Sequence, residues 1–195
     1  SRNFHVTGER SCVGKVAASE YSMPRTAEYT TMIVNADDFG ETAAITQGIF
    51  DCIRAGVVTS TTIMANMPGT NLAMRLAKET KASFGVHLNI CEGYPLTSCP
   101  SLVMHDGKFY PKQKQALRIL SGRVDRKELQ AELTAQVGFI RSAGIAVSHL
   151  DSHKQLHHLP VVSDAVIELA KDTGLERIRC ANEPQKLIRS TLSRG

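Results

Sequence analysis

Apolar residues follow two different periods along most of the chain. Short runs rich in β-branched residues, which are typical of buried strands, alternate with longer segments whose apolar residues recur at helical spacing. The predicted strands are 32–36, 57–65, 83–90, 147–151 and 177–180, and the predicted helices are 41–55, 71–79, 112–121, 126–142 and 160–173. This alternation predicts an α/β fold in which right-handed helical crossovers connect parallel strands.

Two segments break the alternation. Residues 1–30 show no sustained period, so we expect a loosely ordered N-terminal extension, with room for a short helix at 13–19, ahead of one β/α domain over 31–195. Residues 91–111 contain several prolines and glycines and predict a long loop with a small hairpin about Asp106-Gly107. Five strands are too few for a closed barrel. We therefore expect an open sheet or a barrel that this chain leaves truncated.

Composition argues against several classes of protein. The 195 residues are 42% hydrophobic and 22% charged, as in an ordinary globular domain, and the net charge is only +4. No basic stripe carries interleaved aromatic residues and no apolar run reaches the length of a membrane span, so neither nucleic acid nor a membrane is an expected partner. The five cysteines form no Cys-x-x-Cys pair, which favours a reduced, cytoplasmic protein over a disulfide framework.

Three of the predicted strands end in side chains that can bind metal. These side chains are Asp37 and Asp38 after the first strand, His87 near the end of the third, and His149, Asp151, His153 and His157 in and after the fourth. Neutral imidazoles and carboxylates are ligands of divalent metals. Parallel strands present their C-terminal ends at one edge of a sheet. The pattern therefore predicts a metal-dependent hydrolase.

Each of these groups also has a purely structural interpretation. Two adjacent carboxylates at a strand end point in different directions, so one can ligate a metal while the other deprotonates water, but Asp37-Asp38 could equally form a turn before a helix. His87 alone could be a hydrogen-bonded core residue. Asp151 could orient a ligand imidazole instead of binding metal itself. His153 and His157 would share a face if a helical turn begins there.

Four segments carry a resemblance to a known family. They are residues 33–40 (IVNADDFG), 58–62 (VTSTT), 85–88 (GVHL) and 149–153 (HLDSH), the last followed by His157. In this order they resemble the YdjC-like carbohydrate deacetylases, over residues 32–180. The resemblance implies a distorted β/α barrel related to polysaccharide deacetylases, with an N-acetylated sugar or oligosaccharide as substrate.

The resemblance also implies roles for individual residues. One divalent ion would be held by Asp38, His87 and His153, with Asp37 as the general base. Magnesium is usually associated with the family, and imidazole ligands would suit zinc as well. We expect His157 to supply the proton that the leaving amine needs. Three further residues are expected to orient ligands or contact substrate: Asn35, His149 and Asp151.

Two departures from the family pattern keep other functions open. The family often carries His where this chain has Gln155, and its members usually continue well beyond the end of this chain. One alternative is a truncated, non-catalytic domain that binds a sugar or a partner. Another is a metal-dependent phosphoesterase, which would need a second metal about 4 Å from the first. An incomplete barrel would also favour a homo-oligomer.

Overall fold

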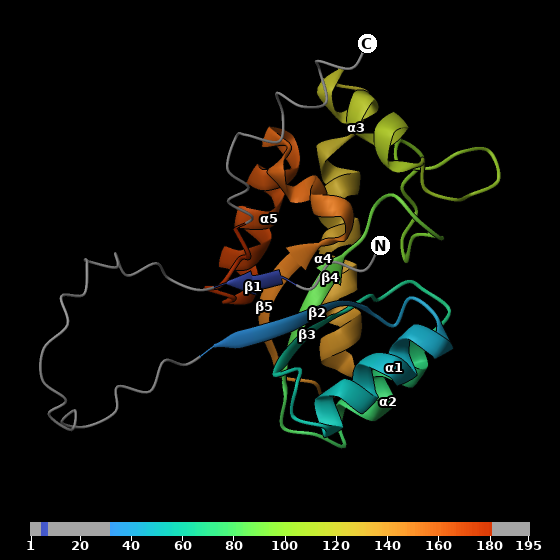
Figure 1. Cartoon of the computed structure of the whole chain (residues 1–195). Helices are drawn as coiled ribbons and strands as arrows, with labels where there is room; N and C mark the ends of the chain where they lie inside the picture. Colours follow the sequence, from blue (N-terminus) through green and yellow to red (C-terminus); the bar gives the residue numbers. More distant parts are fainter. Residues whose placement is uncertain (1–4, 8–31, 181–195) are drawn as a thin grey trace, which may run out of the picture.

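A four-stranded parallel sheet forms the centre of the molecule (Figure 1). The computed structural model describes residues 5–7 and 32–180. The strands pair in the order of the chain, and a short strand pairs antiparallel with the first of them at the sheet edge. The strands are β1 (His5–Thr7), β2 (Ile33–Phe39), β3 (Ser60–Ile63), β4 (Ser83–Leu88) and β5 (Val147–Ser152).

The five helices predicted between residues 41 and 173 are all present; the last two have the predicted ends, and the ends of the other three differ by at most two residues. They are α1 (Ala43–Arg54), α2 (Thr70–Ala77), α3 (Lys112–Leu120), α4 (Arg126–Ser142) and α5 (Pro160–Thr173). The carboxylate of Asp125 caps α4 by accepting from the backbone N–H groups of Lys127 and Glu128. Gly174, at φ 68°, ends α5 in the left-handed conformation that glycine adopts without strain.

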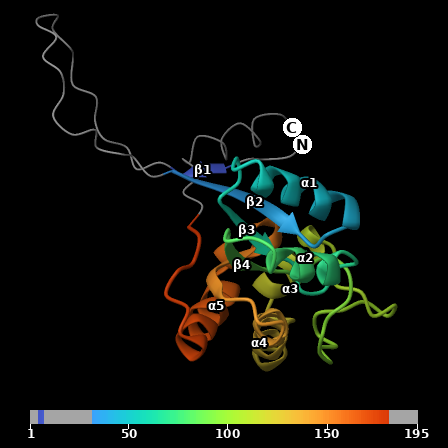
Figure 2. The same cartoon turned by 90° about the horizontal axis from the view of Figure 1, so that it is seen from below.

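The helices form the layer that buries the sheet. α1 contacts β2, α2 contacts β3, and α4 contacts both β4 and β5, while α5 packs on α4 (Figure 2). Side chains from all these elements make one apolar core. Its largest fully buried members include Phe39, Ile63, Leu88, Leu133, Ile140, Leu150 and Leu169. The helices cover the apolar side chains of the sheet. The C-terminal ends of the strands carry polar side chains instead.

The structure differs from the sequence predictions at both edges of the sheet. Residues 5–7 belong to the segment predicted to be loosely ordered, yet they pair with β2. Such a short edge strand depends on distant pairing and leaves no local pattern. Residues 177–180 make only an isolated parallel bridge, between Leu150 and Ile178, instead of a strand. The side chain of Arg179 turns toward the carboxylates of Asp37 and Asp151.

The long loop after β4 follows its prediction in outline. Val103 and Phe109 form one antiparallel bridge around a turn that contains Gly107 at φ 79°, which confirms the small hairpin. The helix predicted at 13–19 and the residues beyond 180 lie outside the described residues. Within residues 5–7 and 32–180, no helix is both long and apolar enough to cross a membrane.

Candidate metal centre

Three side chains from separate strand ends converge on one point. Asp38 comes from β2, His87 from β4, and His153 directly follows β5. Oδ1 of Asp38 lies 3.2 Å from Nε2 of His87 and 3.0 Å from Nδ1 of His153. One ligand atom from each residue lies within 4.8 Å of the others, a grouping that could hold a metal ion. The two rings meet edge to face, with centroids 5.4 Å apart.

An irregularity in β2 separates the two adjacent aspartates. The register with β3 shifts between Ala36 and Phe39, and Asp38 adopts φ 68°. Aspartate tolerates this left-handed conformation better than most residues. As a result Asp38 meets the two imidazoles, while Asp37 meets Asn35 and Arg179. Each carboxylate therefore has its own set of partners.

The chain leaves β2 through Gly40. This residue has φ 107°, and a Cβ there would lie 3.0 Å from the carbonyl oxygen of Met64. Glycine is therefore required both for the backbone conformation and for the close approach to the neighbouring segment.

His87 is buried and held by a carboxylate on its inner side. Its Nδ1 lies 2.5 Å from Oδ1 of Asp151, whose other oxygen accepts a hydrogen bond from Thr62 at 3.0 Å. Burial alone would lower the pKa of His87, but Asp151 and Asp38 raise it to about 10. Burial likewise opposes ionisation of Asp38, yet His153 and His87 hold its pKa well below the usual range. Without a metal, a protonated His87 supplies positive charge between two carboxylates.

His153 has a second carboxylate partner that the sequence reasoning missed. Its Nε2 lies 2.8 Å from Oε2 of Glu92, and the same oxygen accepts from Nζ of Lys154 at 2.7 Å. The ammonium of Lys154 and the ring of His153 lower the pKa of Glu92 against an opposing effect of burial. Glu92 follows the predicted strand 83–90 by two residues, which was the available signal.

A second group of possible ligands contains Asp37, His87 and Asp151. Here a guanidinium already supplies the positive charge, because Nη1 of Arg179 lies 2.6 Å from Asp37 and 3.2 Å from Asp151. Burial would lower the pKa of Arg179, but these two carboxylates raise it. A fixed cation in this position disfavours a second metal there. The sequence pattern places residue 179 in a predicted strand and indicates no role for it.

Two other predicted site residues, His149 and His157, lie beside the centre. His149 packs its ring against Gly85, where a Cβ would lie 2.7 Å from ring atoms, and its Nδ1 is 2.8 Å from the hydroxyl of Ser148. Nδ1 of His157 lies 2.5 Å from Ser152 Oγ, and Nε2 lies 3.0 Å from the carbonyl of Arg179. Burial lowers the pKa of both imidazoles.

The turn after β5 is not a regular helix. Residues His153–His158 form a 3₁₀ segment interrupted by left-handed backbone at Lys154 (φ 54°) and Gln155 (φ 59°). The regular helical turn that would place His153 and His157 on one face is therefore absent from this segment. The interruption turns His153 toward Asp38 and leaves His157 with its own partners.

The sequence of the whole domain identifies its family. The family model described as YdjC-like protein matches residues 31–195. The chain belongs to the YdjC-like family. It is 40% identical over 158 residues to a carbohydrate deacetylase of Geobacillus stearothermophilus, a match that covers 80% of this chain and 60% of that protein. It is 33% identical over 157 residues to a carbohydrate deacetylase of Danio rerio, which covers 78% and 50%.

A solved structure shares the fold of this chain. A crystal structure from Enterococcus faecalis V583, described as a "putative cellobiose-phosphate cleavage protein", matches this YdjC-like chain with a TM-score of 0.69 at 30% identity. The match covers 81% of this chain and 62% of that one. The chain spans about 60% of the length of the bacterial carbohydrate deacetylases that it matches.

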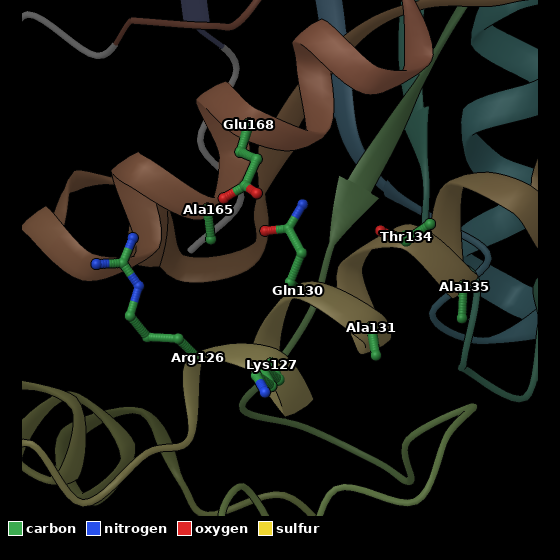
Figure 3. A pocket seen from close by; sticks show the side chains of 8 residues that line it. All are labelled: Arg126, Lys127, Gln130, Ala131, Thr134, Ala135, Ala165 and Glu168. Carbon is green, nitrogen blue, oxygen red and sulfur yellow. The ribbon is translucent and has the colours of Figure 1, made fainter.

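A hollow lies between α4 and α5 (Figure 3). Its lining contains none of the clustered carboxylates and imidazoles. The residues that line it are Arg126, Lys127, Gln130, Ala131, Thr134, Ala135, Ala165 and Glu168. We assign no chemistry to this surface.

Proposed function

We propose that this domain is the metal-binding part of a hydrolase that removes the acetyl group from an N-acetylated sugar. The observation that carries the proposal is the convergence of Asp38, His87 and His153, with a second carboxylate, Asp37, on the adjacent residue. The names of the relatives, carbohydrate deacetylases, supply the substrate class. The reaction adds water to an acetamide and yields acetate and a free amine.

The donor set fits one divalent ion. Two imidazoles and one carboxylate form the three-residue set common at catalytic zinc sites, and the remaining position would be open to water or substrate. When bound, the metal would polarise the acetyl carbonyl and lower the pKa of a water molecule. The resemblance to the family favours magnesium, whereas two imidazole ligands suit zinc better. We propose a single ion, since Arg179 provides the positive charge in the second group.

Asp37 is our candidate for the general base. Asn35 donates to its Oδ1 at 2.9 Å and Arg179 donates to the same oxygen at 2.6 Å. Both donors reach one oxygen, so Oδ2 remains free of them and can accept a proton from water. The two hydrogen bonds fix the carboxylate in one orientation, which general-base catalysis requires.

His157 is our candidate for the proton donor to the leaving amine. Its ring lies next to the backbone of Arg179, whose guanidinium binds Asp37. To donate a proton to substrate, Nε2 of His157 would have to give up its contact with the Arg179 carbonyl and contact the leaving nitrogen instead. The variant His157→Asn tests this role, because loss of the acid should lower turnover while metal binding stays unchanged. Equal turnover in the variant and in wild type would contradict it.

We also propose that the parallel sheet is part of a distorted barrel. The supporting observations are the unbroken strand order and the match to a longer solved structure. A non-catalytic sugar-binding domain and a phosphoesterase are the competing functions. The experiment that separates the three functions measures acetate release from N-acetylated oligosaccharides, together with the metal content per chain. One metal with acetate release supports the proposal, whereas bound sugar without acetate release, or phosphate release with two metals, contradicts it.

A further inference from the structure

Each imidazole beside Asp38 has a carboxylate on its other ring nitrogen. In His87 this nitrogen is Nδ1, which lies 2.5 Å from Asp151, and in His153 it is Nε2, which lies 2.8 Å from Glu92. A carboxylate only accepts hydrogen bonds when ionised, so it selects the tautomer whose N–H points toward it. Once a metal occupies the side of each ring that faces Asp38, the remaining N–H would point toward Asp151 or Glu92 and the lone pair toward the metal.

We propose that Glu92 is a positioning residue, which fixes the tautomer and orientation of His153 for binding a divalent metal. The proposal rests on the proposed function, because it takes Asp38, His87 and His153 as the ligands. Carboxylates that accept from the remote nitrogen of a ligating histidine raise its basicity and hold its ring in place. Glu92 would do for His153 what Asp151 does for His87, on the opposite ring nitrogen.

The turn after β4 holds the backbone of Glu92 in place. Oδ1 of Asn89 accepts from the backbone N–H groups of Cys91 and Glu92, each at 3.1 Å, and Nδ2 of Asn89 donates to the carbonyl of Glu92 at 2.8 Å. Three hydrogen bonds from one fully buried side chain close this turn. The backbone position of Glu92 is therefore fixed independently of the contacts that its side chain makes.

Side chains of helix α4 bind the same turn through hydrogen bonds. The side-chain amide of Gln136 accepts from the backbone N–H of Asn89 at 2.9 Å and donates to the Asn89 carbonyl at 2.7 Å. The carboxylate of Glu132 accepts from the backbone N–H of Thr97 at 2.9 Å and from its hydroxyl at 2.7 Å. Both α4 side chains are fully buried. The loop that carries Glu92 is thus fastened on both sides of that residue.

Lys154 fixes the carboxylate from the other side. Its Nζ and Nε2 of His153 meet the same oxygen, Oε2 of Glu92, at 2.7 and 2.8 Å. Lys154 and Gln155 both have left-handed backbone, a conformation that is strained at non-glycine residues. The ion pair is two-fifths exposed and so contributes little stability by itself. Its structural effect is to hold Glu92 against His153.

The test compares zinc affinity among matched variants, with Zn²⁺ as the probe and a chromophoric chelator as competitor. Glu92→Gln should bind zinc about 10- to 100-fold more weakly than wild type. Glu168→Gln makes the same change of charge in the hollow between α4 and α5 and should leave affinity unchanged. Lys154→Gln keeps the contact between His153 and Glu92, so it should weaken affinity less than Glu92→Gln does.

Nitrogen-15 NMR of the zinc-loaded protein supplies a second readout. In wild type we expect His153 to ligate zinc through Nδ1 and to keep its proton on Nε2. In Glu92→Ala we expect a mixture of His153 tautomers in place of this single one. Equal zinc affinity in wild type and both Glu92 variants would overturn the inference, as would direct ligation of zinc by Glu92. If wild type binds no zinc, the ligand set fails as well. If it binds zinc without releasing acetate, only the proposed function fails.

Discussion

Nη1 of Arg179 lies 2.6 Å from Oδ1 of Asp37, although 142 residues separate them in the chain. The same nitrogen lies 3.2 Å from Asp151, the carboxylate behind His87. Arg179 thereby connects the candidate base to the group that orients a candidate metal ligand. Its backbone carbonyl also lies 3.0 Å from Nε2 of His157. One residue therefore contacts both groups to which we assign proton transfer.

Replacing Arg179 should lower turnover with little effect on metal binding. In Arg179→Gln, Asp37 loses its charged partner and its fixed orientation, so we expect kcat to fall about 10²-fold, the lower end of a general-base contribution. Arg179→Lys keeps the charge but not the geometry of the guanidinium and should recover only part of the activity. The measurement is kcat beside zinc affinity. A Gln variant with normal kcat would remove Arg179 from the mechanism.

Replacing Asp37 by Asn should abolish most turnover and leave the metal in place. The amide keeps the size of the side chain but cannot take a proton from water, and the expected loss in kcat is about 10²- to 10⁴-fold. Asp38→Asn serves as the comparison, because it should lose metal as well as activity. Metal content by elemental analysis distinguishes the two variants. Substantial activity in Asp37→Asn would rule out its role as base.

Replacing Asp151 by Asn should weaken metal binding without changing any ligand. Asp151 is almost fully buried and its carboxylate holds Nδ1 of His87. An amide can present its NH₂ group to that nitrogen and stabilise the wrong tautomer, so affinity should fall about 10- to 100-fold. Thermal unfolding of the metal-free variant shows whether the fold survives. An affinity equal to that of wild type would contradict the role of Asp151 in orienting His87.

The stability of the metal-free protein should fall as pH rises from about 7 to about 10. Burial opposes the charge on His87, but its carboxylate partners raise the pKa in the folded state from 6.5 to about 10. The stabilisation is therefore complete below about pH 6.5 and is lost as pH rises through the folded value. Urea unfolding with a chelator present measures this slope. The His87→Asn variant should show a weaker slope, and an equal slope would contradict the assignment.

Gly85→Ala should destabilise the protein by about 1 to 3 kcal/mol, the usual range for overpacking a buried site. The new Cβ would lie 2.7 Å from ring atoms of His149 and would displace that ring. Gly138→Ala is the matched control, because nothing lies within 4 Å of its Cβ position and alanine favours the interior of α4. It should be neutral or stabilising. Chemical unfolding of both variants tests the contrast.

The grouping of the candidate ligands was predictable because it depends on topology. Parallel strands end at one edge, so acidic and imidazole residues at three strand ends had to lie near one another. The pairs that support them were not predictable. Glu92 and Arg179 reach the site by long side chains from irregular segments, and their directions are set by the turn at Asn89 and by a single bridge at Ile178. Hydrophobic periodicity carries no information about such contacts.

Strand boundaries show the same limit. The run from Val57 was predicted to belong to a strand because it is β-branched, but β3 begins only at Ser60. Val58 is buried and Val57 is exposed, so burial continues outside the hydrogen-bonded ladder. Strand β2 ends at Phe39, three residues beyond the predicted strand, and includes the irregularity at Asp37 and Asp38. Neither end could be located without knowing which residues pair across the sheet.

The left-handed backbone at Asp38 restricts this position to a few residue types, and the charge needed at the site selects aspartate among them. Asparagine or glycine would suit φ 68° but would supply a weaker ligand or none, whereas glutamate would keep the charge and strain the chain. Selection for folding alone would thus accept asparagine or glycine here as readily as aspartate. A sister protein with either residue could keep the fold while losing the negative charge that faces the two histidines.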